Sequence, residues 1–343
     1  MKALVLERYN EFAVRDVAIP VVGPRDVLIK VAACGICGSD IHGMDGSTGR
    51  RIPPVIMGHE AAGNIVEVGS DVTDWKIGER VTFDSTIYCG HCYHCRRGEI
   101  NLCDNRRVLG VSCAEYRQDG AFAEFVAVPE HILYRLPDGV TFEQAAMVEL
   151  LSIAVHAVHR TPIVLNDSAI VVGAGMVGQM VVQVLKAAGC GRIIAVDLEQ
   201  SRLDLALKLG ATHVLRADGP DVPGAVRALT EGRGADVAFE VVGITPTLQL
   251  ASKCVKKGGS VTLVGNLAAE ATLPLQQTVT REITLYGSCA SQGEYPACLD
   301  MIVRGQVDVN ALISAVAPLD EGASWFERLH RGGEGLFKVL LRP

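Results

Sequence analysis

Short apolar runs separated by glycine and proline turns dominate the first part of the chain. In the run at residues 27–33 a polar lysine lies between an isoleucine and a valine, which is the alternation of a half-buried strand. The turn before this run carries the pair Gly23-Pro24, and both residue types interrupt regular structure. We therefore predict a β-rich region up to about residue 150, with strands at residues 2–6, 27–33, 63–68 and 80–83.

Beyond about residue 150 the apolar runs alternate with longer segments of helical spacing. The run at 169–172 is followed by a helix-like segment at 179–188, and the segment 202–209 also has helical spacing. Alternating strands and helices are typical of a parallel sheet with helical crossovers. Further strands are predicted at 192–196, 214–215, 237–240, 260–264 and 283–287.

Length and charge limit the classes of function. A chain of 343 residues predicts about two domains, and the hydrophobic share of 49% is enough for full-sized cores. The net charge of −7 disfavours nucleic acid and anionic membranes as partners, because phosphate binding needs a surplus of lysine and arginine. The N-terminal segment lacks the apolar stretch of a signal peptide, so we expect a cytoplasmic protein with no membrane partner.

A glycine-rich turn indicates a nucleotide site. Gly173, Gly175 and Gly178 form the pattern Gly-x-Gly-x-x-Gly between a predicted strand and a predicted helix. Such glycines let the backbone approach a pyrophosphate, whose charge the helix N-terminus stabilises. Asp197 ends the next strand, where a carboxylate accepts hydrogen bonds from ribose hydroxyls and repels a 2′-phosphate, so we predict NAD rather than NADP. The remaining residues assigned to this site are Met176, Val177 and Arg202.

A cysteine cluster indicates a metal site. Four of the eleven cysteines fall within 15 residues, at Cys89, Cys92, Cys95 and Cys103. Four thiolates at this spacing can close a tetrahedron around one structural zinc ion, with His91 and His94 as possible substitutes. An iron–sulfur loop is disfavoured because seven residues, rather than three, precede the last cysteine. The acidic net charge disfavours a nucleic-acid zinc finger.

A scattered group of residues has the donor types of a second, open zinc site. Cys37, His59, Glu60 and Glu149 offer a thiolate, an imidazole and two carboxylates. Sequence spacing leaves open whether they converge, and the alternative is a buried Cys37 with a surface His59-Glu60 pair.

Residues 58–63, with the sequence Gly-His-Glu-Ala-Ala-Gly and followed by Gly69, resemble the signature of zinc-containing medium-chain alcohol dehydrogenases. The cysteine cluster and the glycine turn follow in the order of that family, so the resemblance covers nearly the whole chain. It implies an α/β fold in which a GroES-like β-rich catalytic domain accompanies a Rossmann domain with a doubly wound parallel sheet. The catalytic domain would span 1–150, with a structural zinc lobe at about 86–105, and would be completed by about 290–343. The NAD-binding Rossmann domain would span 151–289.

The resemblance also implies roles for matching residues. Cys37 and His59 would be ligands of a catalytic zinc ion, and Glu60 a ligand or close partner. Ser39 and His42 would form a proton relay. Each chain would hold two zinc ions and one NAD, would act on a small-molecule alcohol, and would assemble into a dimer or tetramer.

Glu149 places the chain near one branch of that family. Glutamate at this position is typical of polyol dehydrogenases and threonine dehydrogenases, although Leu150 stands where the polyol branch usually has proline. Residues 287–296 contain no arginine, whereas sorbitol dehydrogenases carry an Arg-Tyr pair near there. We therefore expect reversible oxidation of a polyol or sugar alcohol to a ketone or aldehyde. The alternatives are an L-threonine 3-dehydrogenase, a sugar-phosphate polyol dehydrogenase and a relative of zinc-free quinone reductases, which normally lack both zinc ligand sets.

Overall fold

Two compact units make up the described part of the chain. The computed structural model describes residues 1–112 and 117–343. Unit 1 comprises Met1–Glu149, Ser291–Gly305 and Val309–Pro343, and unit 2 comprises Leu150–Ala290 and Gln306–Asp308. Unit 1 is therefore built from both ends of the sequence, and unit 2 mostly from its middle.

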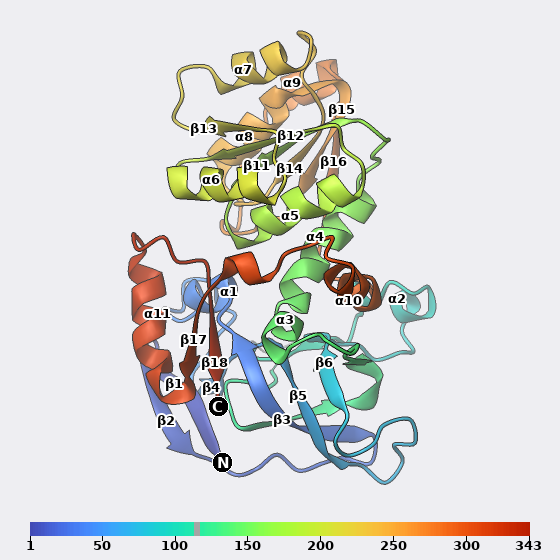
Figure 1. The fold of residues 1–343 in the computed structure, drawn as a ribbon, viewed down its shortest axis with the longest axis vertical. Helices are drawn as coiled ribbons and strands as arrows, with labels where there is room; N and C mark the ends of the chain where they lie inside the picture. The colour runs from blue at the N-terminus through green and yellow to red at the C-terminus, as the bar shows by residue number, and fades with distance from the viewer. Residues whose placement is uncertain (113–116) are drawn as a thin grey trace. The chain divides into compact units, whose positions relative to one another are not determined.

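Strands from both ends of the chain share the larger sheet of unit 1. Its strands are β3 (Asp26–Gly35), β5 (Glu60–Val68), β6 (Arg80–Phe83), β9 (Phe125–Pro129), β10 (Leu133–Arg135), β17 (Ile313–Pro318) and β18 (Lys338–Arg342). The order is β10-β6-β5-β3-β18-β17, and β9 pairs with β3 off this path. β18 lies antiparallel against β3, so the C-terminal strand, red in Figure 1, runs beside the blue strand β3 from the first part of the chain.

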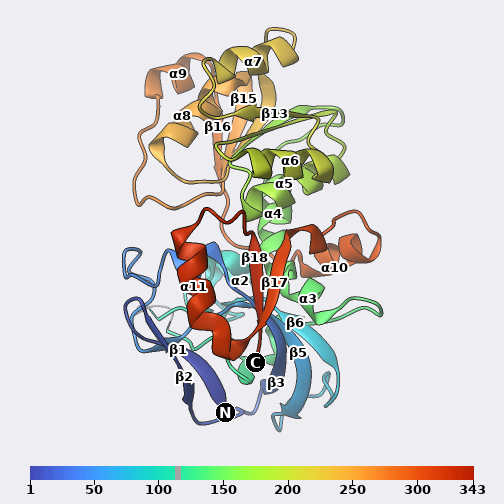
Figure 2. The ribbon, with the colours of Figure 1, turned by 60° about the vertical axis from the view of Figure 1, so that its left-hand side comes forward.

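Smaller elements surround this sheet. A separate sheet contains β1 (Lys2–Arg8), β2 (Glu11–Asp16) and β4 (Val55–Ile56), and β7 (Thr86–Ile87) pairs with β8 (Arg107–Val108). The helices of unit 1 are α1 (Gly38–Ile41), α2 (Tyr93–Arg96), α3 (Phe142–Ala146), α10 (Tyr295–Val303) and α11 (Gly322–Arg331). Phe326 of α11 stacks on Phe12 of β2 with ring centroids 4.4 Å apart, which fixes the helix beside the small sheet (Figure 2).

Unit 2 contains one parallel sheet. Its strands are β11 (Ser168–Val172), β12 (Arg192–Asp197), β13 (His213–Arg216), β14 (Ala235–Glu240), β15 (Val255–Leu263) and β16 (Thr284–Gly287). All five residues of β11 are buried, because a strand in the centre of a parallel sheet is covered on both faces. The order is β13-β12-β11-β14-β15-β16, so the direction of winding reverses between β11 and β14. Ligands of such sheets bind at the carboxyl ends of the strands beside this reversal.

Helices cover both faces of the parallel sheet. The helices in this part of the chain are α4 (Val148–Arg160), which begins in unit 1, and α5 (Met176–Ala187), α6 (Gln200–Leu209), α7 (Val222–Leu229), α8 (Thr245–Cys254) and α9 (Leu275–Thr280). Crossovers between parallel strands are right-handed, so α5, which leads toward β12, and α8, which leads toward β15, lie on opposite faces (Figure 1). The predicted combination of a β-rich unit with a doubly wound parallel sheet is confirmed.

The predicted elements of unit 2 are present with shifted ends. The helix predicted at 179–188 is α5, which begins at Met176, because Gly175 has extended backbone geometry and precedes the first helical residue inside the glycine motif. The helix predicted at 202–209 is α6, and it begins two residues earlier. Among the described residues, no helix combines the length and apolar character needed to cross a membrane.

Candidate functional site

The metal-ligating candidates of unit 1 lie at the ends of two paired strands. β3 ends at Gly35, whose register partner is Glu60, the first residue of β5. Cys37 follows the end of β3 by two residues, and His59 directly precedes β5. Antiparallel pairing therefore brings Cys37, His59 and Glu60 to one edge of the sheet.

Cys37, His59 and Glu60 form a compact donor set. One ligand atom from each residue lies within 4.8 Å of the others. His59 and Glu60 are buried, and Cys37 is half-buried. Glu60 Oε1 is buried and, within the described ranges, has no hydrogen-bond partner. Zinc takes sulfur, imidazole nitrogen and carboxylate oxygen as ligands, and a bound cation would satisfy the unpaired oxygen, so these residues fit a zinc ion.

Glu149 lies in α4, half-buried and outside the compact donor set. Ser85 Oγ donates a hydrogen bond to Glu149 Oε1 at 3.4 Å. Burial raises the pKa of Glu149 to about 7; His59 works against this rise and Glu60 adds to it. The charges of His59 and Glu60 therefore influence the pKa of Glu149. Its role as a metal ligand stays a prediction.

A buried ion pair supports His59 from behind. Asp40 Oδ1 accepts a hydrogen bond from Arg51 Nη2 at 2.8 Å and lies 3.5 Å from His59 Nδ1, an ion-pair distance without a hydrogen bond. Burial works against the ionised form of Asp40, but His59 and Arg51 hold the pKa of that carboxyl well below its usual range. Burial alone would lower the pKa of His59, whereas Asp40 and Cys37 raise it well above its usual value. Because Nδ1 faces Asp40, Nε2 is the nitrogen left for a metal.

The predicted proton relay lies on one helical turn next to Cys37. Cys37 is the N-cap of α1, Ser39 lies within α1, and His42 is its C-cap. Ser39 and His42 are both exposed, and Arg51 Nη2 donates a hydrogen bond to Ser39 Oγ at 3.4 Å. The relay stays a prediction.

The four clustered cysteines converge. Cys89, Cys92, Cys95 and Cys103 place their sulfur atoms within 4.8 Å of one another. A backbone hydrogen bond at His91 is the main cause that lowers the pKa of Cys89, to about 6, which favours the thiolate form that binds metal. The two candidate substitutes are engaged elsewhere, because His91 Nδ1 lies 2.8 Å from Cys89 O and His94 Nδ1 lies 2.8 Å from Glu99 Oε2. The geometry therefore favours the all-cysteine set.

The glycine loop and Asp197 lie at the carboxyl ends of β11 and β12. The loop packs closely, since a Cβ on Gly178 would lie 1.9 Å from the carbonyl oxygen of Gly173. Asp197 is buried, and its carboxylate accepts hydrogen bonds from the N–H groups of Ala174 at 2.7 Å and Glu199 at 2.9 Å. It therefore holds the glycine loop, and its contact with a ribose stays a prediction. The other predicted cofactor residues lie around it, Gly175, Met176 and Val177 half-buried at the start of α5 and Arg202 with Nη1 3.7 Å from Asp197 Oδ2.

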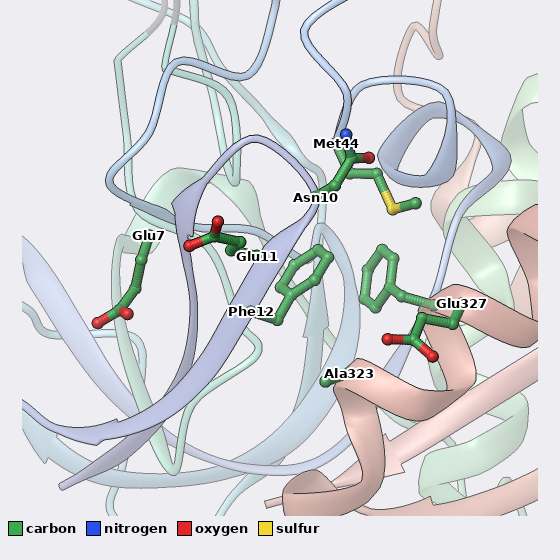
Figure 3. A pocket seen from close by; sticks show the side chains of 8 residues that line it. Glu7, Asn10, Glu11, Phe12, Met44, Ala323 and Glu327 are labelled. Atoms are coloured by element: carbon green, nitrogen blue, oxygen red, sulfur yellow. The ribbon is translucent and has the colours of Figure 1, made fainter.

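A hollow in unit 1 is separate from these groups of residues. Its volume is about 340 Å³, and Figure 3 shows Glu7, Glu11 and Glu327 around the ring of Phe12. Glu7 is already paired with Arg15 at 2.6 Å. Within the described ranges, none of the predicted site residues lines this hollow, and we assign it no ligand.

Sequence reasoning missed four residues that contact these sites. Asp40, Arg51 and Lys338 surround the donor set, and Gln179 Nε2 donates hydrogen bonds to the carbonyl oxygens of Ala174 and Arg202. Asp40 lies between the site candidates Cys37 and His42, and Gln179 directly follows the glycine motif, so their sequence neighbours were a usable signal. Arg51 and Lys338 had none, because only the tertiary structure brings them to the site.

Two family profiles match the chain. The alcohol dehydrogenase GroES-like domain matches residues 23–138, and the zinc-binding dehydrogenase profile matches residues 176–304. The sorbitol dehydrogenase of Bacillus subtilis (strain 168) is 34% identical over 348 residues, which cover 100% of this chain and 97% of that enzyme. The D-arabitol-phosphate dehydrogenase of Enterococcus avium is 34% identical over 339 residues, which cover 97% of this chain and 94% of that enzyme.

A solved structure resembles the chain along its whole length. It is a protein described as a zinc-binding dehydrogenase, from Sinorhizobium meliloti 1021 and bound to NADP. The TM-score is 0.92 at 32% sequence identity, and the match covers 100% of this chain and 99% of that chain.

Proposed function

The chain belongs to the zinc-containing medium-chain alcohol dehydrogenase family, in its polyol dehydrogenase branch, and we propose that it oxidises a polyol or sugar alcohol reversibly with NAD. The product is a ketone or aldehyde. The observation that carries this proposal is the buried donor set of Cys37, His59 and Glu60, with ligand atoms within 4.8 Å of one another.

The residues of unit 1 divide into ligands and supports. Cys37 and His59 would hold the catalytic zinc ion, with Glu149 as a further ligand and Glu60 as a ligand or close partner. When bound, zinc supplies a Lewis acid that lowers the pKa of the substrate hydroxyl, and NAD supplies the hydride acceptor. Asp40 orients the His59 ring through Nδ1, as carboxylates do for metal-binding histidines.

Ser39 and His42 would carry the hydroxyl proton to solvent. Both lie at the exposed turn that begins with Cys37, so a proton released beside Cys37 has a short path outward. Histidine exchanges protons near neutral pH, which suits the last position of such a relay.

The second metal site would be structural. Four converging sulfur atoms would supply all four ligands that a structural zinc ion takes, and would leave no position for substrate. Cys89, Cys92, Cys95 and Cys103 therefore hold the lobe together rather than take part in the reaction.

Asp197 supports NAD as the preferred dinucleotide. Its buried carboxylate stands beside the glycine loop, where a 2′-phosphate would meet its negative charge. Arg202 lies 3.7 Å from that carboxylate and is half-exposed, so it partly offsets the charge. The relative from Sinorhizobium meliloti is bound to NADP, so the preference needs a direct comparison of the two dinucleotides.

A phosphorylated polyol is the second candidate substrate. The relative from Enterococcus avium is a D-arabitol-phosphate dehydrogenase at the same identity of 34% as the sorbitol dehydrogenase. A phosphate group would require a basic pocket in addition to the metal site.

We also propose a homo-oligomer, dimer or tetramer, in a reducing cytoplasm. β16 is the last strand of its sheet, pairing only with β15 among the described strands, and the neighbouring α9 exposes Leu275 and Val279. The cysteines of the described ranges form no disulfide, as a reducing compartment allows.

Substrate oxidation tests the proposal directly. Zinc-loaded protein is mixed with NAD or NADP and a panel of sugar alcohols, polyol phosphates, L-threonine and simple alcohols, and formation of the reduced dinucleotide is followed. We expect turnover of an unphosphorylated polyol with NAD. Turnover of polyol phosphates alone would favour the second candidate, and turnover of L-threonine alone would contradict the polyol assignment. Silence across the panel, in protein shown to bind zinc and NAD, would also contradict it.

A further inference from the structure

Lys338 places a positive charge inside unit 1 next to the donor set. It is the first residue of β18, and its side chain is fully buried. The ammonium group donates hydrogen bonds to Glu60 Oε2 at 2.5 Å and to the carbonyl oxygen of Ile36 at 3.1 Å. Lysine is among the residues least often fully buried, and a buried lysine is normally paired. The complete burial of Lys338 beside Glu60 therefore indicates a specific role for this pair.

The sheet provides a cradle for the Glu60 carboxylate. Gly35 is the register partner of Glu60 on β3, and Leu340 of β18 pairs with the same Gly35 from the other side. A Cβ on Gly35 would lie 2.3 Å from Glu60 Oε2. The absent side chain of Gly35 therefore leaves the space that the carboxylate occupies, and Lys338 closes that space from β18.

The two oxygen atoms of Glu60 have different surroundings. Oε2 is bound by Lys338, whereas Oε1 is buried without a hydrogen-bond partner in the described part of the chain. Glu60 also has a carboxylate oxygen within 4.8 Å of ligand atoms of Cys37 and His59. With Oε2 held, Oε1 is the oxygen that remains available to a cation.

We propose that Lys338 is a positioning residue for the catalytic metal site, which holds Glu60 Oε2 so that Oε1 is presented to the metal. This inference rests on the proposed function, since it needs a metal held by Cys37 and His59. It also balances charge, because a thiolate and two carboxylates around a divalent ion leave one excess negative charge, which Lys338 neutralises. The C-terminal strand thus supplies part of the metal site without supplying a ligand.

Cobalt substitution tests the proposal through a readout other than activity. The protein is loaded with Co²⁺ in both metal sites, and the spectrum of a Cys37→Ser variant, which reports the four-cysteine lobe alone, is subtracted. The remaining visible bands report the coordination at Cys37. Metal affinity at this site is measured separately by competition with a chelator.

Lys338→Met is expected to shift the cobalt bands and to weaken metal binding about 10- to 100-fold, the usual range for partners of metal ligands. Lys338→Arg, which keeps the buried charge but moves the donor, is expected to fold and to shift the bands less. Glu60→Gln removes the charge that Lys338 binds, so adding Lys338→Met to it should change the bands no further. Lys256→Met, which removes the lysine of the Lys256–Asp236 pair in unit 2, is the matched control and should leave bands and affinity unchanged.

The results separate the inference from the function on which it rests. If Lys338→Met and Lys338→Arg lower the melting temperature but leave bands and affinity as in the unchanged protein, the pair only fastens β18 to the sheet and the inference is wrong. If Cys37→Ser takes up as much cobalt as the unchanged protein, with the same spectrum, no metal binds at Cys37. That outcome would overturn the proposed function together with the inference.

Discussion

The glycine loop of unit 2 and the donor set of unit 1 differ in how their residues are spread along the chain. The loop and Asp197 come from two successive strands, β11 and β12, which pair directly in a parallel sheet. The donor set lies where β3 meets β5, and its lysine comes 278 residues after Glu60. The first site is therefore contained in one stretch of sequence, whereas the second exists only after distant strands have paired. We therefore expect a substitution in the donor set to reduce turnover without reducing dinucleotide binding, and a substitution in the glycine loop to reduce dinucleotide binding without reducing metal content.

The largest expected effect comes from Cys37→Ser. Loss of the thiolate ligand removes the metal's stabilisation of developing charge, worth several kcal/mol, so we expect turnover to fall about 1000-fold or more. Dinucleotide binding should persist, because the glycine loop belongs to unit 2. Steady-state kinetics and a fluorescence titration with NADH measure the two quantities.

Cys289→Ser is the matched control for this substitution, because Cys289 is an exposed cysteine in unit 2. It should leave both turnover and binding unchanged. Full activity in Cys37→Ser would contradict the assignment of Cys37 as a metal ligand. The proposed catalytic site would then have no sulfur ligand.

Gly178→Ala is expected to weaken dinucleotide binding and to leave the metal sites intact, the reverse of the result expected for Cys37→Ser. The added Cβ would lie 1.9 Å from Gly173 O, so the loop must shift to accept it. Overpacking of this kind costs about 1–3 kcal/mol, which predicts NADH affinity weaker by about 10- to 100-fold if the loop carries the strain. Zinc content should stay at the level of the unchanged protein.

Gly175→Ala separates packing from ligand contact. A Cβ on Gly175 meets no atom within 4 Å, so its melting temperature should equal that of the unchanged protein. If Gly178→Ala binds NADH normally, close packing of the loop is not what forms the dinucleotide site.

The contrast between the sites also explains how much the sequence predicted. The doubly wound sheet was predictable because strands and helices alternate along unit 2 from β11 to β16, and the motif around Gly173 marks the first crossover. Convergence of Cys37 with His59 depends on the register of β3 against β5, which no local pattern encodes. Lys338 lies in an apolar C-terminal run, where no neighbouring residue indicates a partner for its charge. Only the pairing of β18 with β3 brings it next to Glu60.

A smaller effect is expected from Asp197→Ser, which tests the preference for NAD. Removing the carboxylate lifts its repulsion of a 2′-phosphate and removes one acceptor for the ribose, so the ratio of kcat/KM for NAD over NADP should fall about tenfold. Affinity for both dinucleotides should also fall, because Asp197 accepts hydrogen bonds from Ala174 and Glu199 in the loop. Asp197→Asn keeps an acceptor without the charge and separates the two effects. An unchanged ratio in both variants would show that Asp197 supports only the loop.

The smallest expected effect is on the pH dependence of stability. Two carboxylates, one in each unit, have shifted pKa values, and the two shifts have opposite directions. Asp84 of unit 1 is buried between Thr86, whose N–H it accepts at 2.8 Å, and Ser291, whose Oγ donates to it at 3.0 Å. Burial raises the pKa of Asp84 from 3.8 to about 6. Asp236 of unit 2 is paired with Lys256, and although burial works against it, hydrogen bonds from Lys256 and Ser168 lower its pKa.

The two carboxylates should therefore give stability opposite dependences on pH. Between pH 4 and 6 the folded protein holds a proton on Asp84 that the unfolded chain has released, so this carboxylate makes stability fall as pH rises and then level off. Asp236 contributes stability above its ordinary pKa of 3.8, and that contribution is lost as pH falls. Asp84→Asn should raise the melting temperature near pH 7, relative to pH 4, by about 3 °C. Asp236→Asn should lower the melting temperature by a similar amount at every pH from 4 to 7, and by less below pH 3.8, where the contribution of Asp236 is lost in the unchanged protein. Calorimetry at pH 3, 4, 5, 6 and 7 measures both variants, and the same dependence on pH in the two variants would contradict the assignment of opposite pKa shifts to the two carboxylates.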